Sequence, residues 1–282
     1  MKEITINSSE ISVRISSMGA ELQSIRDRDG QERLWQGNPA FFAGRAPILF
    51  PVAGGFRDDC YWLNGKRYPM SKHGFVRRLD WAVEQETETQ AVFLMTEKNE
   101  GFPFNYELRA LFSVQNSTLT VSYIVSSNHE TPFYFGLGSH EAYATSGGIE
   151  DYELVFDEPE RLDVYPLEGN LTLRKPWLLA DNTRTLPLKQ HYFAVDALVF
   201  RTLRSRGVTL RNKQNAHTLR VEYPDHPVLM LWTKPGAEYL CIEPWCNGPD
   251  YVDADVNIEK KFGFIRLNQS DTVTRTHRII LG

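Results

Sequence analysis

Cysteine is scarce in this sequence, with three among 282 residues: Cys60, Cys241 and Cys246. An odd number of widely spaced cysteines does not form a disulfide framework. Four residues separate Cys241 from Cys246, and no second pair lies nearby, which argues against a zinc site. We therefore expect three reduced thiols and no bound metal.

Long apolar runs and excess positive charge are also missing. No stretch approaches the roughly 20 apolar residues that a membrane-spanning helix needs, and residues 1–7 contain no apolar signal core. The net charge of -5 leaves no basic surface of the kind that nucleic acid binds. We expect a cytoplasmic protein that binds neither membranes nor nucleic acid.

The sequence contains no long amphipathic helix, internal repeat or low-complexity linker. Apolar and polar residues instead alternate in short runs that end at turn residues, which is typical of an all-β protein. Alternation is clearest at Tyr106–Phe112 and Leu119–Val125, and Asn64-Gly65 predicts a hairpin turn. With 41% hydrophobic residues and no break in composition, the chain is expected to form a single domain over residues 1–282.

Two later segments are harder to assign from their pattern. Leu171–Leu188 is polar and interrupted by proline, which indicates a long connection. His191–Phe200 fits either a short helix or a strand.

Polar residues in irregular or strand-end positions are the candidates for chemistry. Arg45 and His73 lie in a region rich in glycine, proline and aromatic residues, and such loops commonly carry functional sites. His140 follows an aromatic strand, and Glu243 follows an apolar one. Pro244 restricts Glu243 to extended backbone, which helps to hold its carboxylate in one orientation.

Histidine and glutamate form a ready acid–base pair, since their unperturbed pKa values are near 6.5 and 4.3. Aromatic rings suited to packing against pyranose faces are also available, so a sugar is the expected ligand. The tryptophans in question are Trp35, Trp62, Trp232 and Trp245. Each feature has a simpler alternative: a surface arginine, an exposed turn histidine, a solvated strand-end acid or aromatic core packing.

Four motifs in this order resemble the aldose 1-epimerase (galactose mutarotase) superfamily, and within it the branch of bacterial LacX-like proteins. They are Gly44-Arg-Ala-Pro-Ile-Leu-Phe-Pro51, His73-Gly-Phe-Val-Arg77, Gly138-Ser-His140 and Cys241-Ile-Glu-Pro-Trp245. The resemblance covers nearly the whole chain. It implies a galactose mutarotase-like β-sandwich that interconverts the α and β anomers of an aldose without a cofactor.

The resemblance also implies roles for individual residues. Glu243 is expected to be the general base and His140 the general acid. Arg45 and His73 are expected to bind sugar hydroxyls, as is Asp196, whose motif is weaker. The sequence departs from many relatives at Glu141, where they have proline. If Glu141 faces His140 it should raise the pKa of that histidine; if it faces outward it should have no effect.

Other functions remain open at this stage. Arg57, Arg77 and Arg78 favour a mutarotase for phosphorylated sugars, because arginine binds phosphate bidentately. A sugar-binding or sugar-sensing protein without turnover is a second alternative. A glycoside hydrolase or lyase is a third, but it usually needs two carboxylates. The sequence names neither the sugar nor the choice between monomer and homodimer.

Overall fold

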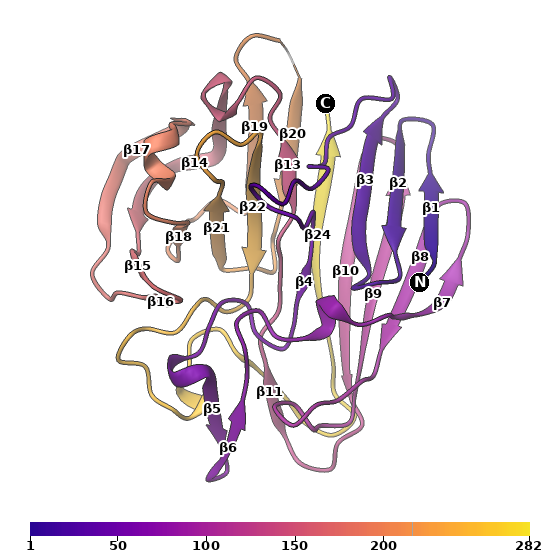
Figure 1. Ribbon diagram of the computed structural model, residues 1–282, viewed down its shortest axis with the longest axis vertical. Coiled ribbons are helices and arrows are strands. Elements are labelled where there is room, and N and C mark those ends of the chain that lie inside the picture. Colours follow the sequence, from indigo (N-terminus) through magenta and orange to yellow (C-terminus); the bar gives the residue numbers. More distant parts are fainter. Residues whose placement is uncertain (216) are drawn as a thin grey trace.

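The computed structural model describes residues 1–215 and 217–282, and these residues form mainly β-strands (Figure 1). The helical segments among them are short 3-10 turns: η1 (Arg57–Asp59), η2 (Val76–Arg78), η3 (Ile149–Asp151), η4 (Gln190–Phe193) and η5 (Ile258–Lys260). No helix within the described ranges is long and apolar enough to cross a membrane. The all-β prediction is confirmed.

The largest element is an antiparallel sheet of nine strands. Its strands, in spatial order, are β17 (Trp177–Pro187), β14 (Tyr152–Val164), β19 (Gly207–Asn212), β20 (Thr218–Glu222), β24 (Thr272–Leu281), β10 (Thr118–Ser127), β9 (Tyr106–Gln115), β8 (Gln90–Met95) and β7 (Ala82–Glu86). Buried and partly exposed residues alternate strictly along β9 and β10. One face of this part of the sheet therefore lies against the core, as the sequence alternation predicts.

A second sheet carries the candidate site. Its spatial order is β18 (Leu198–Phe200), β21 (Val228–Trp232), β22 (Tyr239–Trp245), β12 (Gly138–Ser139) and β4 (Ile48–Leu49), and β13 (Ala142–Ala144) also pairs with β22. Smaller sheets are β1 (Glu3–Asn7), β2 (Ile11–Ser16) and β3 (Glu21–Asp27), then β11 (Phe133–Phe135) with β23 (Ile265–Leu267), β15 (Leu167–Glu168) with β16 (Leu171–Thr172), and β5 (Cys60–Leu63) with β6 (Lys66–Pro69).

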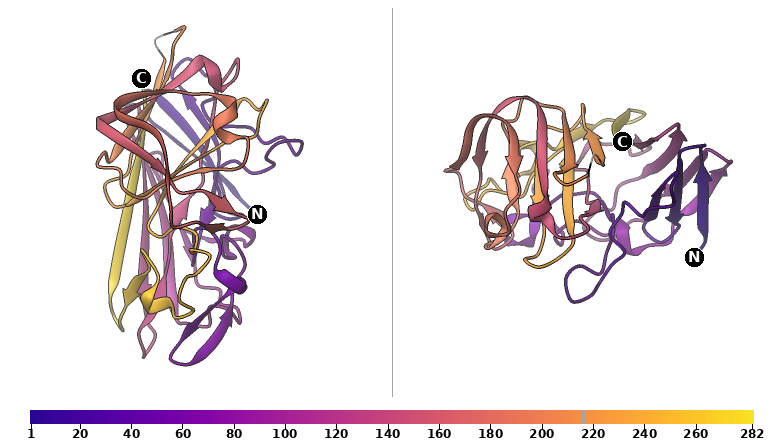
Figure 2. Two further views of the ribbon diagram at one scale, coloured as in Figure 1. Left: turned by 90° about the vertical axis from the view of Figure 1, so that its left-hand side faces the viewer. Right: turned by 90° about the horizontal axis from the view of Figure 1, so that it is seen from above.

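The sheets form a sandwich. β1 and β2 contact β8, β9 and β10, while β18 of the second sheet contacts β14, so the β1–β3 sheet and the second sheet cover the nine-stranded sheet (Figure 2). Apolar side chains from both layers join in one large core cluster. All seven residues of β22 are buried, because one face meets this core and the other lies beneath the candidate site.

Most local expectations hold, and one is wrong. Asn64 and Gly65 have φ of 52° and 75° and connect β5 to β6, which confirms the hairpin.

The segment 171–188 is not a connection, because it contains β16 and the long edge strand β17. β17 is exposed over most of its length, so its sequence lacks the alternation that a half-buried strand shows. The ambiguous segment 191–200 holds both the end of η4 and β18. The three cysteines are free, as expected, and all three are buried.

Candidate active site

Strand geometry brings His140 and Glu243 together. His140 lies between β12 and β13, which pair with the β22 residues on either side of Glu243. The backbone N–H of Ile242 donates to the carbonyl of Glu141, at 3.2 Å. Because side chains alternate across a strand, His140 and Glu243 lie on one face, and Glu141 and Ile242 on the other. Nε2 of His140 is 3.5 Å from Oε2 of Glu243.

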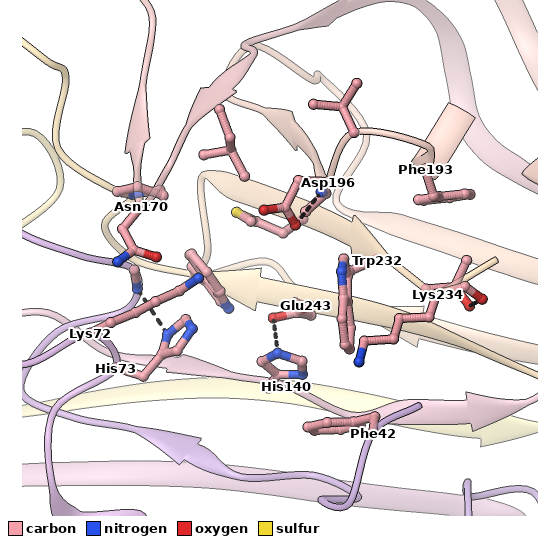
Figure 3. A pocket seen from close by; sticks show the side chains of 18 of the residues that line it. Phe42, Lys72, His73, His140, Asn170, Phe193, Asp196, Trp232, Lys234 and Glu243 are labelled. Atoms are coloured by element: carbon pink, nitrogen blue, oxygen red, sulfur yellow. Dashed lines mark hydrogen bonds and ion pairs between the residues drawn. The ribbon is translucent and has the colours of Figure 1, made fainter. Parts of the chain in front are cut away.

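This pair lies at the base of a cavity of about 570 Å³ (Figure 3). The residues that Figure 3 labels around it are Phe42, Lys72, His73, His140, Asn170, Phe193, Asp196, Trp232, Lys234 and Glu243. Oε2 of Glu243 and Nδ1 of His140 are buried and have no hydrogen-bond partner in the described chain.

Aromatic contacts fix the orientation of the His140 ring. Phe42 stacks on it with ring centroids 5.1 Å apart, and Trp232 meets it edge to face at 5.8 Å. His73 also approaches edge to face, at 5.8 Å. Packing on several sides leaves the imidazole little freedom to rotate away from Glu243.

His73 occupies an unusual backbone conformation, with φ of 65°. Gly74 follows at φ of 65°, where a Cβ atom would collide with the carbonyl of Phe50. Nδ1 of His73 accepts a hydrogen bond from the Gly54 N–H at 3.1 Å. Burial lowers the pKa of His73 well below 6.5, so the ring is neutral and its proton is on Nε2. His73 can therefore donate one hydrogen bond into the cavity.

Burial shifts the pKa values of the central pair in opposite directions. It raises the pKa of Glu243 well above its usual value, and Glu141 adds to this effect while Lys72 opposes it. It lowers the pKa of His140 to about 4, although Glu141 acts against the shift. The sequence suggested a carboxylate with an ordinary pKa, but burial disfavours both charged forms. Burial therefore favours the uncharged form of each residue, which is the protonated carboxyl of Glu243 and the neutral imidazole of His140.

Glu141 fits neither orientation considered from the sequence. Its side chain is turned into the core, where Oε1 lies 2.9 Å from Nε2 of His277 on β24. Both side chains are almost fully buried. Glu141 does act to raise the pKa of His140, but the burial of His140 outweighs it.

Two of the three predicted binding residues line the cavity, and the third does not. His73 and Asp196 line the cavity, and the Asp196 carboxylate accepts a hydrogen bond from the N–H of Ala197 at 2.8 Å. The side chain of Arg45 is not part of the cavity lining, and its Cζ lies near Gly37. Its backbone carbonyl instead accepts a bond from Ala142, which supports the strand after His140.

Three cationic side chains line the cavity, and the sequence singled out only one of them, Arg77. Of the arginines considered for phosphate, Arg77 lines the cavity while Arg57 and Arg78 do not. Lys72 and Lys234 also line it. Within residues 1–215 and 217–282, neither lysine forms an ion pair with a carboxylate. Lys72 could have been identified as a site residue because it directly precedes the His73-Gly74 motif, whereas no sequence pattern marks Lys234.

One group of potential metal ligands coincides with this site. Donor atoms of His140, Cys241 and Glu243 all lie within 4.8 Å of one another. Zinc would require the thiolate form of the cysteine. Burial, reinforced by Glu243 and Glu141, raises the pKa of Cys241 well above its usual value, which opposes that form.

Comparison with known proteins gives one consistent result. Residues 2–279 match the family described as aldose 1-epimerase. The plasmid-encoded protein LacX of Lactococcus lactis subsp. lactis is 29% identical over 296 residues, which cover 99% of each chain.

Solved structures agree. A galactose mutarotase related enzyme from Lactobacillus acidophilus has a TM-score of 0.93 and 29% identity, covering 100% of this chain and 97% of that one. A galactose mutarotase-like protein from Lactobacillus casei ATCC 334 has a TM-score of 0.92 and 26% identity, with 100% of both chains covered. The protein belongs to the aldose 1-epimerase family.

Proposed function

We propose that this protein is an aldose 1-epimerase that interconverts the α and β anomers of a reducing sugar. The observation that carries the proposal is the separation of 3.5 Å between Nε2 of His140 and Oε2 of Glu243 at the base of a cavity. Anomerisation requires proton movements at two oxygens bonded to the same carbon. An acid and a base this close together can reach both oxygens at once.

The reaction starts with protonated Glu243 and neutral His140, so that the two residues share one exchangeable proton. Transfer of that proton from Glu243 to His140 gives a carboxylate and an imidazolium. Glu243 then takes the proton of the anomeric hydroxyl, the O1 electrons form a C=O bond, the C1–O5 bond breaks, and His140 protonates O5. Rotation about C1–C2 presents the other face of the aldehyde. On closure, His140 recovers the O5 proton as O5 attacks C1, and Glu243 returns a proton to O1.

The other cavity residues have positioning roles in this proposal. His73 donates from Nε2 to a sugar hydroxyl, and Asp196 accepts from one with the carboxylate oxygen not engaged by Ala197. Phe42 and Trp232 offer aromatic surface beside the ring. Arg45 retains its proposed role in hydroxyl binding only if its side chain turns toward the cavity.

An anomerisation screen tests the proposal. Saturation transfer between the two anomeric NMR signals is measured for free hexoses and pentoses, with and without the protein. We expect faster exchange for at least one sugar. Binding without any rate enhancement would support a sugar sensor instead, and release of a monosaccharide from a glycoside would support a hydrolase.

A phosphorylated sugar is the second candidate substrate. The observation that favours it is that Lys72, Arg77 and Lys234 line the cavity without carboxylate ion pairs in the described structure. Cations without carboxylate partners in a partly enclosed site favour an anionic ligand group. The same screen therefore includes hexose 6-phosphates, and a higher kcat/KM for these than for free hexoses would select this candidate.

A further inference from the structure

A hollow of about 320 Å³ adjoins the loop that follows β22. Its lining comes from three segments: Arg174 after β16, Arg201 after β18, and residues between 248 and 262, a stretch that includes η5. Among the residues that the structure describes, only Pro249 lines both this hollow and the catalytic cavity. The volume falls within the range of about 300–1,000 Å³ that is typical of small-molecule sites. We refer to it as the Arg201 hollow.

Positive charge is in excess in the Arg201 hollow. Its cationic side chains are Arg174, Arg201, Lys260 and Lys261. Three of them have carboxylate partners, in the pairs Arg174–Asp253 at 2.7 Å, Lys260–Asp255 at 3.0 Å and Lys261–Asp250 at 2.6 Å. Within residues 1–215 and 217–282, Arg201 forms no ion pair with a carboxylate. One positive charge therefore remains available to an anionic ligand.

The Arg201 guanidinium is held in place by its surroundings. Nη2 donates hydrogen bonds to the carbonyl of Pro249 at 2.7 Å and to Oγ1 of Thr172 at 3.0 Å. Cζ lies 4.6 Å from the ring centroid of Tyr251 and 5.3 Å from that of Phe262, within the range of cation–π contacts. Burial lowers the pKa of Arg201, because it disfavours the charged form. An oxyanion in the hollow would offset that cost through a charge-assisted hydrogen bond.

The side chains around the hollow suit a phosphate group. Arginine presents five N–H donors in a planar fork, and the contacts of Arg201 to Pro249 and Thr172 use Nη2 alone. Lys260 lines the same hollow with its side chain 65% exposed, so it is free to turn from Asp255 to a ligand. A phosphate monoester offers three oxygens and up to about two negative charges, so it can accept from both cations at once. A carboxylate offers only two oxygens in one plane.

We propose that the Arg201 hollow binds the phosphate group of a small phosphorylated metabolite, at a position separate from the catalytic cavity. The inference does not depend on the proposed function, because none of the proposed catalytic or sugar-binding residues lines this hollow. It also differs from a phosphorylated substrate in the cavity, whose phosphate would contact Lys72, Arg77 or Lys234. None of those three side chains lines the Arg201 hollow.

Two exposed lysines offer a matched pair of variants. Lys260 pairs with Asp255 and Lys2 pairs with Glu86, and the two lysine side chains are 65% and 56% exposed. Lys260→Met and Lys2→Met therefore remove the same charge from similar surface pairs, but only the first changes the hollow. Arg201→Met removes the central cation together with its hydrogen bonds, so thermal unfolding is measured alongside it.

Isothermal titration calorimetry with inorganic phosphate and glycerol 3-phosphate tests the proposal. Neither probe has an anomeric carbon. Wild type should bind glycerol 3-phosphate saturably, with a Kd that rises with KCl concentration, and should bind succinate more weakly. Lys260→Met should raise this Kd at least about fivefold and Arg201→Met at least about tenfold. In Lys2→Met and Lys234→Met it should stay within about twofold.

The contrary outcomes are distinct. Absence of saturable binding to wild type, or equal weakening by Lys260→Met and Lys2→Met, would refute the site. Loss of binding in Lys234→Met with retention in Lys260→Met would mean that the phosphate occupies the catalytic cavity, which also refutes it. Tighter binding of succinate would overturn the assignment to phosphate. If Arg201→Met does not fold, the comparison of the two lysine variants still decides. A sugar screen without any rate enhancement would refute the proposed function and leave this inference standing.

Discussion

Oε1 of Glu141 lies 2.9 Å from Nε2 of His277, with both side chains buried between the two layers of the sandwich. Glu141 directly follows His140, and its backbone carbonyl binds the residue before Glu243. His277 belongs to β24 of the nine-stranded sheet. The contact therefore ties the two central residues of the site to the opposite sheet.

Removing this carboxylate should destabilise the protein. Glu141→Ala leaves the His277 imidazole buried without its partner, which costs roughly 1–3 kcal/mol. Urea unfolding measures the change. Glu86→Ala is the control, because Glu86 pairs with Lys2 at the surface and its loss should cost less than about 1 kcal/mol. Equal effects of the two variants would show that the Glu141–His277 contact contributes little to stability.

The pH profile should reflect a pair that works with one proton. Activity should fall below about pH 4, where His140 is protonated while Glu243 is also protonated. It should fall again as pH rises through the raised pKa of Glu243, where neither residue carries the exchangeable proton. Glu141→Gln removes a negative charge that raises the pKa of Glu243, so the alkaline limb should move to lower pH.

The corresponding control is Glu86→Gln, which should leave both limbs in place. The measurement is kcat/KM for mutarotation across pH, after subtraction of the uncatalysed rate. A shift of the alkaline limb to higher pH in Glu141→Gln would contradict the electrostatic role of Glu141.

The central residues of this site could be predicted from the sequence because they lie in recognisable motifs. Glu243, His140, His73 and Asp196 come from distant segments, and the structure gathers all four around one cavity. Arg45 belongs to an equally clear motif, yet its side chain is not in the lining. A motif identifies the residue but not the direction in which its side chain points.

What sequence could not supply was three-dimensional environment. Glu141 was considered as facing the site or solvent, but its partner His277 is 136 positions away, so only the fold reveals the inward orientation. Burial also reverses the simple expectation for the pKa values of His140 and Glu243. Trp177 lay in a segment assigned to a connection, because an exposed edge strand carries no periodic signal.

His73→Asn should weaken substrate binding with little change in fold. Asparagine tolerates the left-handed backbone at this position and can still accept from Gly54, but it lacks the Nε2 donor. Loss of one hydrogen bond should lower kcat/KM roughly tenfold, mainly through KM. His129 lies outside the cavity, so His129→Asn serves as the control. An unchanged KM in His73→Asn would remove His73 from the binding residues.

Lys234→Met separates phosphorylated from neutral substrates. If Lys234 binds a phosphate, kcat/KM for a hexose 6-phosphate should fall roughly tenfold, while that for the free hexose stays within about twofold. Lys98→Met removes an exposed lysine outside the cavity and should change neither value. Equal effects of Lys234→Met on both substrates would count against a phosphate contact at this residue.

The most direct test of the account is the anomeric exchange rate of wild type, Glu243→Gln and His140→Asn on the sugar that the screen selects. Glu243→Gln keeps the size of the side chain and His140→Asn keeps a polar side chain, but each removes the proton-transfer role, so each should lose at least about 10²-fold in kcat with its thermal unfolding otherwise similar to wild type. The double variant should lose little more than the worse single one, because the two residues act as a unit. Rates near wild type in both folded single variants would contradict the assignment of His140 and Glu243 as the acid–base pair.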